Sequence, residues 1–120
     1  DAKIAGGVLV INGRIEDDLM ISGSQIILKD GSEIGGDLVA GGGVLDVEGT
    51  VYGETILSGD SITIAGKING SVKISNVREL TITDGAEIKG DVVYNSTQKA
   101  NISDNARIGG EVKASITEKG

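Results

Sequence analysis

A short phrase recurs six times along the chain and constrains its fold more than any other feature. The copies read R-I-E-D-D-L, E-I-G-G-D-L, T-V-Y-G-E-T, K-I-N-G-S-V, E-I-K-G-D-V and R-I-G-G-E-V. Their apolar anchors are Ile15, Ile34, Val51, Ile68, Ile88 and Ile108, which are separated by 19, 17, 17, 20 and 20 residues. A repeat of this length indicates a stack of similar structural units.

Four further columns of mainly apolar residues accompany the anchors. The first pair of columns is Leu19, Leu38, Thr55, Val72, Val92 and Val112, followed two residues later by Ile21, Ala40, Leu57, Ile74, Tyr94 and Ala114. The second pair is Leu9, Ile26, Leu45, Ile62, Leu80 and Ala100, followed two residues later by Ile11, Leu28, Val47, Ile64, Ile82 and Ile102. A spacing of two residues places both side chains on one face of a strand.

Each repeat therefore predicts three short strands, and the sequence shows no helical period. Such strands can bury their apolar faces only when successive repeats stack and pair in parallel. We expect an all-β fold, a single-domain β-helix (β-solenoid) of about six turns. The predicted domain spans residues 1–120, with partial turns at both ends. In this fold Tyr94 lies in the core, where its hydroxyl needs a partner, and Tyr52 faces outward.

Two kinds of corner account for the uneven spacing. The tight corner reads I-N-G-R-I, V-E-G-T-V and I-A-G-K-I, and the longer one reads L-K-D-G-S-E-I, I-T-D-G-A-E-I and I-S-D-N-A-R-I. Asp-Gly and Asp-Asn favour turns and tolerate positive φ. A further column holds Gly36, Gly53, Gly70, Gly90 and Gly110, with Asp17 in the first repeat. We expect a left-handed backbone conformation at this column, which Asp can also adopt.

The composition excludes several functions. The chain has no Cys and no His, which excludes thiol chemistry, zinc sites of the usual ligands and an imidazole base. A net charge of −7 and only two aromatic residues argue against binding nucleic acid. The carboxylate pairs Asp17–Asp18 and Asp46–Glu48 are typical of surface charge, and no long loop forms a cleft. We therefore predict no enzyme activity, no catalytic residue and no cofactor.

An acidic row follows the anchors at a distance of three residues. Its members are Asp18, Asp37, Glu54, Ser71, Asp91 and Glu111. Stacked strands would place them about 4.8 Å apart, so that like charges repel. We interpret the row as a solvated edge that keeps neighbouring rods apart. One carboxylate per turn supplies too few oxygen atoms for a cation such as Ca²⁺, so we predict no metal site.

The two ends of the predicted solenoid provide the functional hypothesis. Each end of such a coil exposes apolar side chains and unpaired backbone groups, which favour pairing with another chain unless they are capped. The sequence contains no Pro and no amphipathic helix that would cap them. We expect copies of the chain to meet through residues at the two ends, namely Ala2, Ile4, Leu9 and Ile11 at the first and Val112, Ala114 and Ile116 at the last.

The recurring phrase E/K-I-x-G-D-L/V and the corners I-x-G/D/N-x-A/K/R resemble those of bactofilins, the bacterial polymer-forming cytoskeletal proteins. The resemblance runs from about Ile4 to Val112, and G-D-L-V-A-G-G-G-V-L-D-V-E-G is most similar to an envelope-associated or membrane-associated subgroup. It implies a right-handed β-helix and head-to-tail filaments that need no nucleotide and scaffold membrane or cell-wall proteins. The chain departs from the family in having no Pro-bearing tails and no Phe for an aromatic end contact.

A second hypothesis stays open at this point, a monomeric cell-surface β-solenoid that binds a glycan or a protein. The sequence gives only weak signals for the location of the protein in the cell. Three of the six asparagines, Asn69, Asn95 and Asn101, stand in N-x-S/T sequons, which favours an extracytoplasmic place in the cell envelope. The lack of Cys fits either side of a membrane, so the cytoplasmic face stays open as well.

Overall fold

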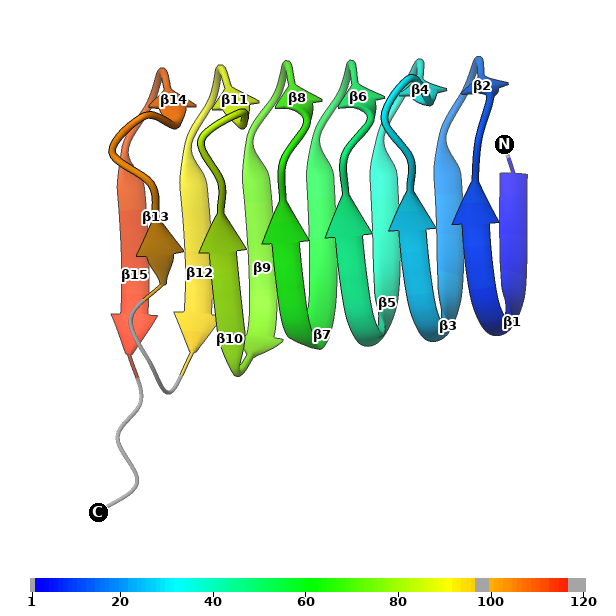
Figure 1. Ribbon diagram of the computed structural model, residues 1–120, viewed down its shortest axis with the longest axis horizontal. Coiled ribbons are helices and arrows are strands. Elements are labelled where there is room, and N and C mark those ends of the chain that lie inside the picture. Colours follow the sequence, from blue (N-terminus) through cyan, green and yellow to red (C-terminus); the bar gives the residue numbers. More distant parts are fainter. Residues whose placement is uncertain (1, 97–99, 117–120) are drawn as a thin grey trace.

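The protein is a right-handed coil of parallel β-strands, which confirms the predicted β-solenoid of about six turns (Figure 1). The computed structural model describes residues 2–96 and 100–116. Within these residues there is no helix, and so none that is long and apolar enough to cross a membrane. The windings follow one another along the longest axis of the molecule, from β1 at one end to β15 at the other (Figure 1).

Two parallel sheets run the length of the coil. The larger contains, in order, β1 (Ala2–Ile11), β3 (Leu19–Leu28), β5 (Leu38–Val47), β7 (Thr55–Ile64), β9 (Val72–Val77), β12 (Val92–Ser96) and β15 (Val112–Ile116). In the same sheet β10 (Glu79–Ile82) pairs with β7 and with β13 (Asn101–Ile102). The smaller contains β2 (Arg14–Ile15), β4 (Glu33–Ile34), β6 (Thr50–Val51), β8 (Lys67–Ile68), β11 (Glu87–Ile88) and β14 (Arg107–Ile108).

Each winding has three sides. The third side is a two-residue strand (Figure 1). We predicted separate strands for the first two sides, and this holds for β9 and β10 and for β12 and β13. In the earlier windings β1, β3, β5 and β7 instead run through the bend between these sides without interruption. Glycines stack in register at the bend, and a Cβ on Gly59 would lie only 2.5 Å from the carbonyl oxygen of Gly42. The absence of a side chain lets the strands stay paired there.

The register of the strands explains the unequal repeat lengths. The tight corner gives 17 residues between anchors, and the Asp-Gly corner of the second winding adds two, closed by a hydrogen bond from the Ser32 N–H to the Lys29 carbonyl at 3.0 Å. The repeat from Ile68 to Ile88 has one residue more. Tyr94 pairs with Ile74 but Ser96 pairs with Val77, so the additional residue forms a β-bulge at the bend. The two corner types were predicted, and the bulge was not.

The predicted apolar columns form the core. Every anchor pairs with the next anchor along the smaller sheet, and the first pair of columns is likewise in register from Leu19 to Val112. Most members in the inner windings are buried. Tyr94 is buried as expected, and its hydroxyl accepts a hydrogen bond from the Ala100 N–H at 3.0 Å. Thr55 is also fully buried, and its hydroxyl has no hydrogen-bond partner.

The glycine column two residues after the anchors has a different cause from the one predicted. Positive φ occurs among the described glycines only at Gly13 and at Gly31, which lies in an Asp-Gly turn. The column is instead set by the close approach of successive windings. A Cβ on Gly53 would lie 2.7 Å from the Gly36 carbonyl oxygen and would overlap the carboxylate of Asp37. The exception, Asp17, lies between β2 and β3, at the first of the described corners that follow the third side.

This close approach predicts a sharp contrast between two Gly→Ala substitutions. Gly53→Ala forces the corners of two windings apart and should lower the free energy of unfolding by about 2–3 kcal/mol. Gly41→Ala adds the same methyl group where the nearest atom, the Ser58 carbonyl oxygen, is 3.8 Å away, so its effect should be small. Denaturant unfolding followed by circular dichroism measures both variants. Equal effects would contradict the steric explanation.

Candidate functional site

The first end of the coil is formed by β1, which has a neighbour on one edge only, β3. Residues Ile4, Leu9 and Ile11 pair with Ile21, Ile26 and Leu28 of the next winding. The residues of the next winding are 1–2% exposed, whereas those of β1 are only half-buried. Ala2 pairs with Leu19, and its side chain lies outside the described residues. The predicted contact residues of this end therefore form the outermost layer of the core, which no further described strand covers.

The other end is formed by β15, which pairs on one edge with β12. Val112 continues the column of Val92 and is 42% exposed, although Val92 itself is fully buried. Ala114, which continues the column of Tyr94, is also exposed. Ile116 pairs with Ser96, and its side chain lies outside the described residues. At both ends the apolar columns thus reach the surface in a strand with one edge that no described strand covers.

Apolar residues on the outside of the first windings were missed by the sequence analysis. Val8 and Val10 of β1 are 66% and 49% exposed on the second side, and Met20 of β3 is 51% exposed on the first side. Their signal was present in the sequence, because V-L-V-I places apolar residues at outward as well as inward positions of one strand. They extend the apolar surface of the first end around its rim.

The acidic row proves to be part of the corner itself. The Asp37 N–H donates to Asp18 Oδ1 at 2.7 Å, and the Glu54 N–H donates to Asp37 Oδ1 at 2.9 Å. The Asp91 N–H likewise donates to Ser71 Oγ at 3.1 Å, and the Glu111 N–H to Asp91 Oδ1 at 2.9 Å. Each of these side chains thus binds the backbone of the next winding. The row that we interpreted as a solvated edge therefore also joins neighbouring windings through hydrogen bonds.

The glycine column and the acidic row work together. The place that a Cβ would occupy at Gly36, Gly53 and Gly110 is filled by the carboxylate of the preceding winding, which comes from Asp18, Asp37 and Asp91. The carboxylate then accepts the N–H of the residue that follows the glycine. This arrangement explains why Gly and Asp stand side by side in the recurring phrase. Among the described residues, no group of three or more acidic side chains is placed to hold a metal ion.

Asp46 and Glu48 come together on the outside of the second side, where β5 ends. Partial burial, the hydrogen bond that protonated Asp46 donates to the Glu48 carboxylate, and the Glu48 charge raise the pKa of Asp46 to about 6. Burial is the largest of the three causes. The other predicted pair, Asp17 and Asp18, lies at the corner before β3, where Asp18 binds the backbone of the next winding. Glu48 also lines a shallow notch at the adjoining corner.

Tyr52 lies outside the coil, as predicted, directly after β6. It is 47% exposed, and its hydroxyl donates to Glu33 Oε1 of the preceding winding at 2.8 Å. This hydrogen bond to Glu33 raises the pKa of Tyr52, and the negative charge of Glu33 adds to the effect. Tyr52 therefore ties two windings together on the third side.

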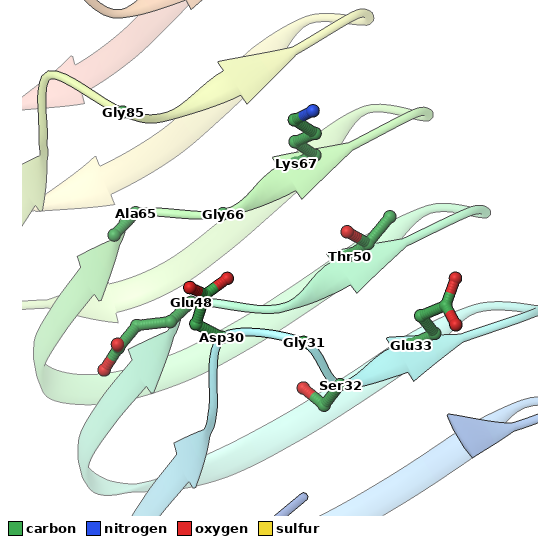
Figure 2. A pocket seen from close by; sticks show the side chains of 10 residues that line it. All are labelled: Asp30, Gly31, Ser32, Glu33, Glu48, Thr50, Ala65, Gly66, Lys67 and Gly85. Atoms are coloured by element: carbon green, nitrogen blue, oxygen red, sulfur yellow. The ribbon is translucent and has the colours of Figure 1, made fainter. Parts of the chain in front are cut away.

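A shallow notch opens at the corner between the second and third sides (Figure 2). The tight corners of two windings form its floor, and it lies between the longer Asp-Gly corner at Asp30 and the corner that contains Gly85. Its volume is about 360 Å³. Figure 2 shows its lining, which is mostly polar and comes from four successive windings: Asp30, Gly31, Ser32, Glu33, Glu48, Thr50, Ala65, Gly66, Lys67 and Gly85. The notch is thus a direct product of unequal corner lengths.

Comparison of the chain with protein-family models, with curated proteins and with solved structures finds no match.

The corner hydrogen bonds predict different results for two substitutions of Asp37. Asp37→Ala removes the acceptor for the Glu54 N–H and should lower the free energy of unfolding by about 1 kcal/mol. Asp37→Asn keeps an acceptor oxygen and removes a negative charge from the row, so it should be at least as stable as the unchanged protein. Thermal unfolding at low salt tests the pair. An Ala variant as stable as the Asn variant would show that the bond contributes nothing.

The raised pKa of Asp46 predicts a pH-dependent effect of Asp46→Asn. Since its folded pKa is about 6 and the ordinary value is 3.8, the favourable contribution of protonated Asp46 is complete below about pH 4 and is lost as the pH rises through 6. Asp46→Asn should therefore raise stability at pH 7.5, by about 1 kcal/mol after allowance for solvent screening. The gain should disappear near pH 4. Equal gains at both pH values in denaturant unfolding would contradict this account.

Proposed function

We propose that the protein is a structural, polymer-forming protein whose copies assemble end to end into filaments. The observation that carries the proposal is the exposure of the core columns at both ends, through Ile4, Leu9 and Ile11 in β1 and through Val112 and Ala114 in β15. In the interior of the coil the same columns are covered by a further winding. The end of a second copy presents a winding similar to the one that covers these columns in the interior.

Backbone groups add direction to this apolar contact. The outer edges of β1 and β15 present N–H and C=O groups that no described strand pairs. A strand of another copy could continue the ladder at the usual spacing of about 4.8 Å. The same edges are avoided or covered in soluble β-proteins that stay monomeric. Hydrogen bonds of the ladder and burial of the apolar columns would together oppose the entropy lost on association.

The resemblance of the recurring phrase to bactofilins supports the same function. It suggests filaments that form without a nucleotide, involve no enzyme activity and scaffold membrane or cell-wall proteins. We further propose a place in the cell envelope, on the extracytoplasmic side. Support for that side comes from the sequons, since Asn95 and Asn101 are exposed on the outside of the coil and Asn69 is half-buried.

The notch favours a second candidate, a monomeric module that binds a polar ligand such as a glycan. Its lining combines three carboxylates with the hydroxyl of Thr50 and the amine of Lys67. The carboxylates can accept hydrogen bonds from sugar hydroxyls, the Lys67 amine can donate to them, and the Thr50 hydroxyl can do either. A chain that stays monomeric at high concentration and at several salt concentrations would favour this candidate over the filament.

Placing a charge on the end of the core should abolish assembly. Ile4→Asp puts a carboxylate into the proposed contact, and we expect at least a tenfold rise in the concentration at which polymers appear. Ala114→Asp should act in the same way at the other end. Size-exclusion chromatography with light scattering and negative-stain microscopy measure assembly, and circular dichroism verifies that the coil stays folded.

The matched control is Val44→Asp, which makes the same kind of change at a 44%-exposed position in the middle of the coil. This variant should assemble normally. Polymers that persist in both end variants would place the contacts on the sides of the coil. A monomeric unchanged protein would contradict the proposed function itself.

A further inference from the structure

One row of residues on the outside of the first side differs from the rest of the surface. Strand pairing aligns its seven members, one from each strand of this side: Lys3, Met20, Val39, Ile56, Lys73, Val93 and Lys113. We call it the lysine row. Its lysines are exposed, and Met20 and Ile56 are 51% and 42% exposed. The row thus combines positive charge with apolar side chains that solvent reaches.

Few other long side chains lie beside the lysine row. The parallel row beside it holds only small residues over the first five strands, namely Ala5, Ser22, Gly41, Ser58 and Ser75. Among the described residues that point outward from the strands of the first side, none is acidic. This is unusual for a chain with 18 acidic and 11 basic residues. The long side chains of the row are therefore the most prominent groups on this side.

The acidic row runs parallel to the lysine row at the adjoining corner. Asp18 precedes Met20 by two residues, and the same offset separates every member of the acidic row from the lysine row. At about 3.3 Å per residue, the two rows are about 7 Å apart. The carboxylates of Asp18, Asp37 and Asp91 accept a backbone N–H through Oδ1, and a carboxylate has capacity for further donors. The acidic row alone would keep neighbouring rods apart, as we interpreted it from the sequence. Together with the lysine row it forms one strip of two opposite charges along the coil.

We propose that this strip pairs two filaments side by side through a second copy of the same strip. A twofold axis parallel to the coil reverses the order of the rows across the contact, so that each lysine row faces the partner's acidic row. Lys113 is level with Glu111 along the coil. Lys73 is level with Ser71, and the carboxylates of Glu54 and Asp91 lie one winding to either side of it. Met20 and Ile56 would be covered between the charged residues.

Charge favours a second copy over a lipid surface. An anionic membrane would attract the three lysines, but the acidic row at the border of the same side would repel it. The partner most complementary to the strip has a basic row next to an acidic one, and this chain supplies it. The inference rests on the proposed function, because exposed ion pairs are individually weak and become effective when a filament repeats the strip many times.

Salt and charge reversal test the pairing. At low ionic strength, about 20 mM, negative-stain microscopy of the full chain should show filaments in pairs or bundles, and at about 500 mM these should separate into single filaments. Lys73→Glu should reduce the paired fraction at least tenfold at low salt, whereas Lys73→Arg should preserve it. The control Lys29→Glu makes the same charge change at an exposed corner away from the strip and should leave the pairs intact.

Several outcomes would overturn the proposal. Pairs that survive high salt or the Lys73→Glu change would show that another surface holds them, and so would equal effects of Lys73→Glu and Lys29→Glu. Lysine-dependent sedimentation with phosphatidylserine vesicles, without pairing, would assign the row to a lipid surface. Single filaments at low salt would contradict the pairing and leave the proposed function intact, whereas the absence of any filament would contradict both.

Discussion

The interval of about 4.8 Å between successive windings is the constraint on which the rest of the structure depends. In the long strands, ordinary parallel pairing gives this interval. At the corners the interval is harder to keep, because the backbone turns away from the ladder while the next winding stays equally close. The corner that follows the third side solves this with a glycine and a carboxylate. The glycine makes room, and the carboxylate of one winding takes up the N–H of the next.

The core could be predicted from the sequence because the regular stacking of windings requires apolar residues at regular positions along the chain. Ile34, Val51 and Ile68 recur at nearly constant spacing, and their neighbours two residues apart indicate strands. The reason for the glycine column could not be predicted in the same way. Gly53 must be glycine because the carbonyl oxygen of Gly36, 17 residues away in the sequence, leaves no room for a Cβ. Local sequence propensity suggests only a turn. The β-bulge opposite Tyr94 was missed because we attributed the uneven spacing to the corners alone, although the spacing of 20 rather than 19 residues after Ile68 marks the additional residue.

The candidate site could be predicted in part. The end residues Ile4 and Val112 were identified from the columns, and the structure places them in the first and last strands of the larger sheet. The lysine row was not identified, since Lys3, Lys73 and Lys113 are far apart in the sequence and no shared motif surrounds them. Only the register of seven strands brings them into line. Features that depend on the outside of a sheet are less constrained by burial, and their pattern in the sequence is correspondingly weak.

Each winding contacts mainly the windings next to it, and this has a mechanical consequence. The free energy of such a coil is close to a sum over neighbouring layers, so a terminal layer with one neighbour is held less firmly than an internal one. Local opening should therefore begin at β1 or β15 and spread inward layer by layer, and amide protons near the centre should exchange last. In a filament every terminal layer would gain a second neighbour. Assembly and resistance to unfolding would then rise together, without any change in the interior of the domain.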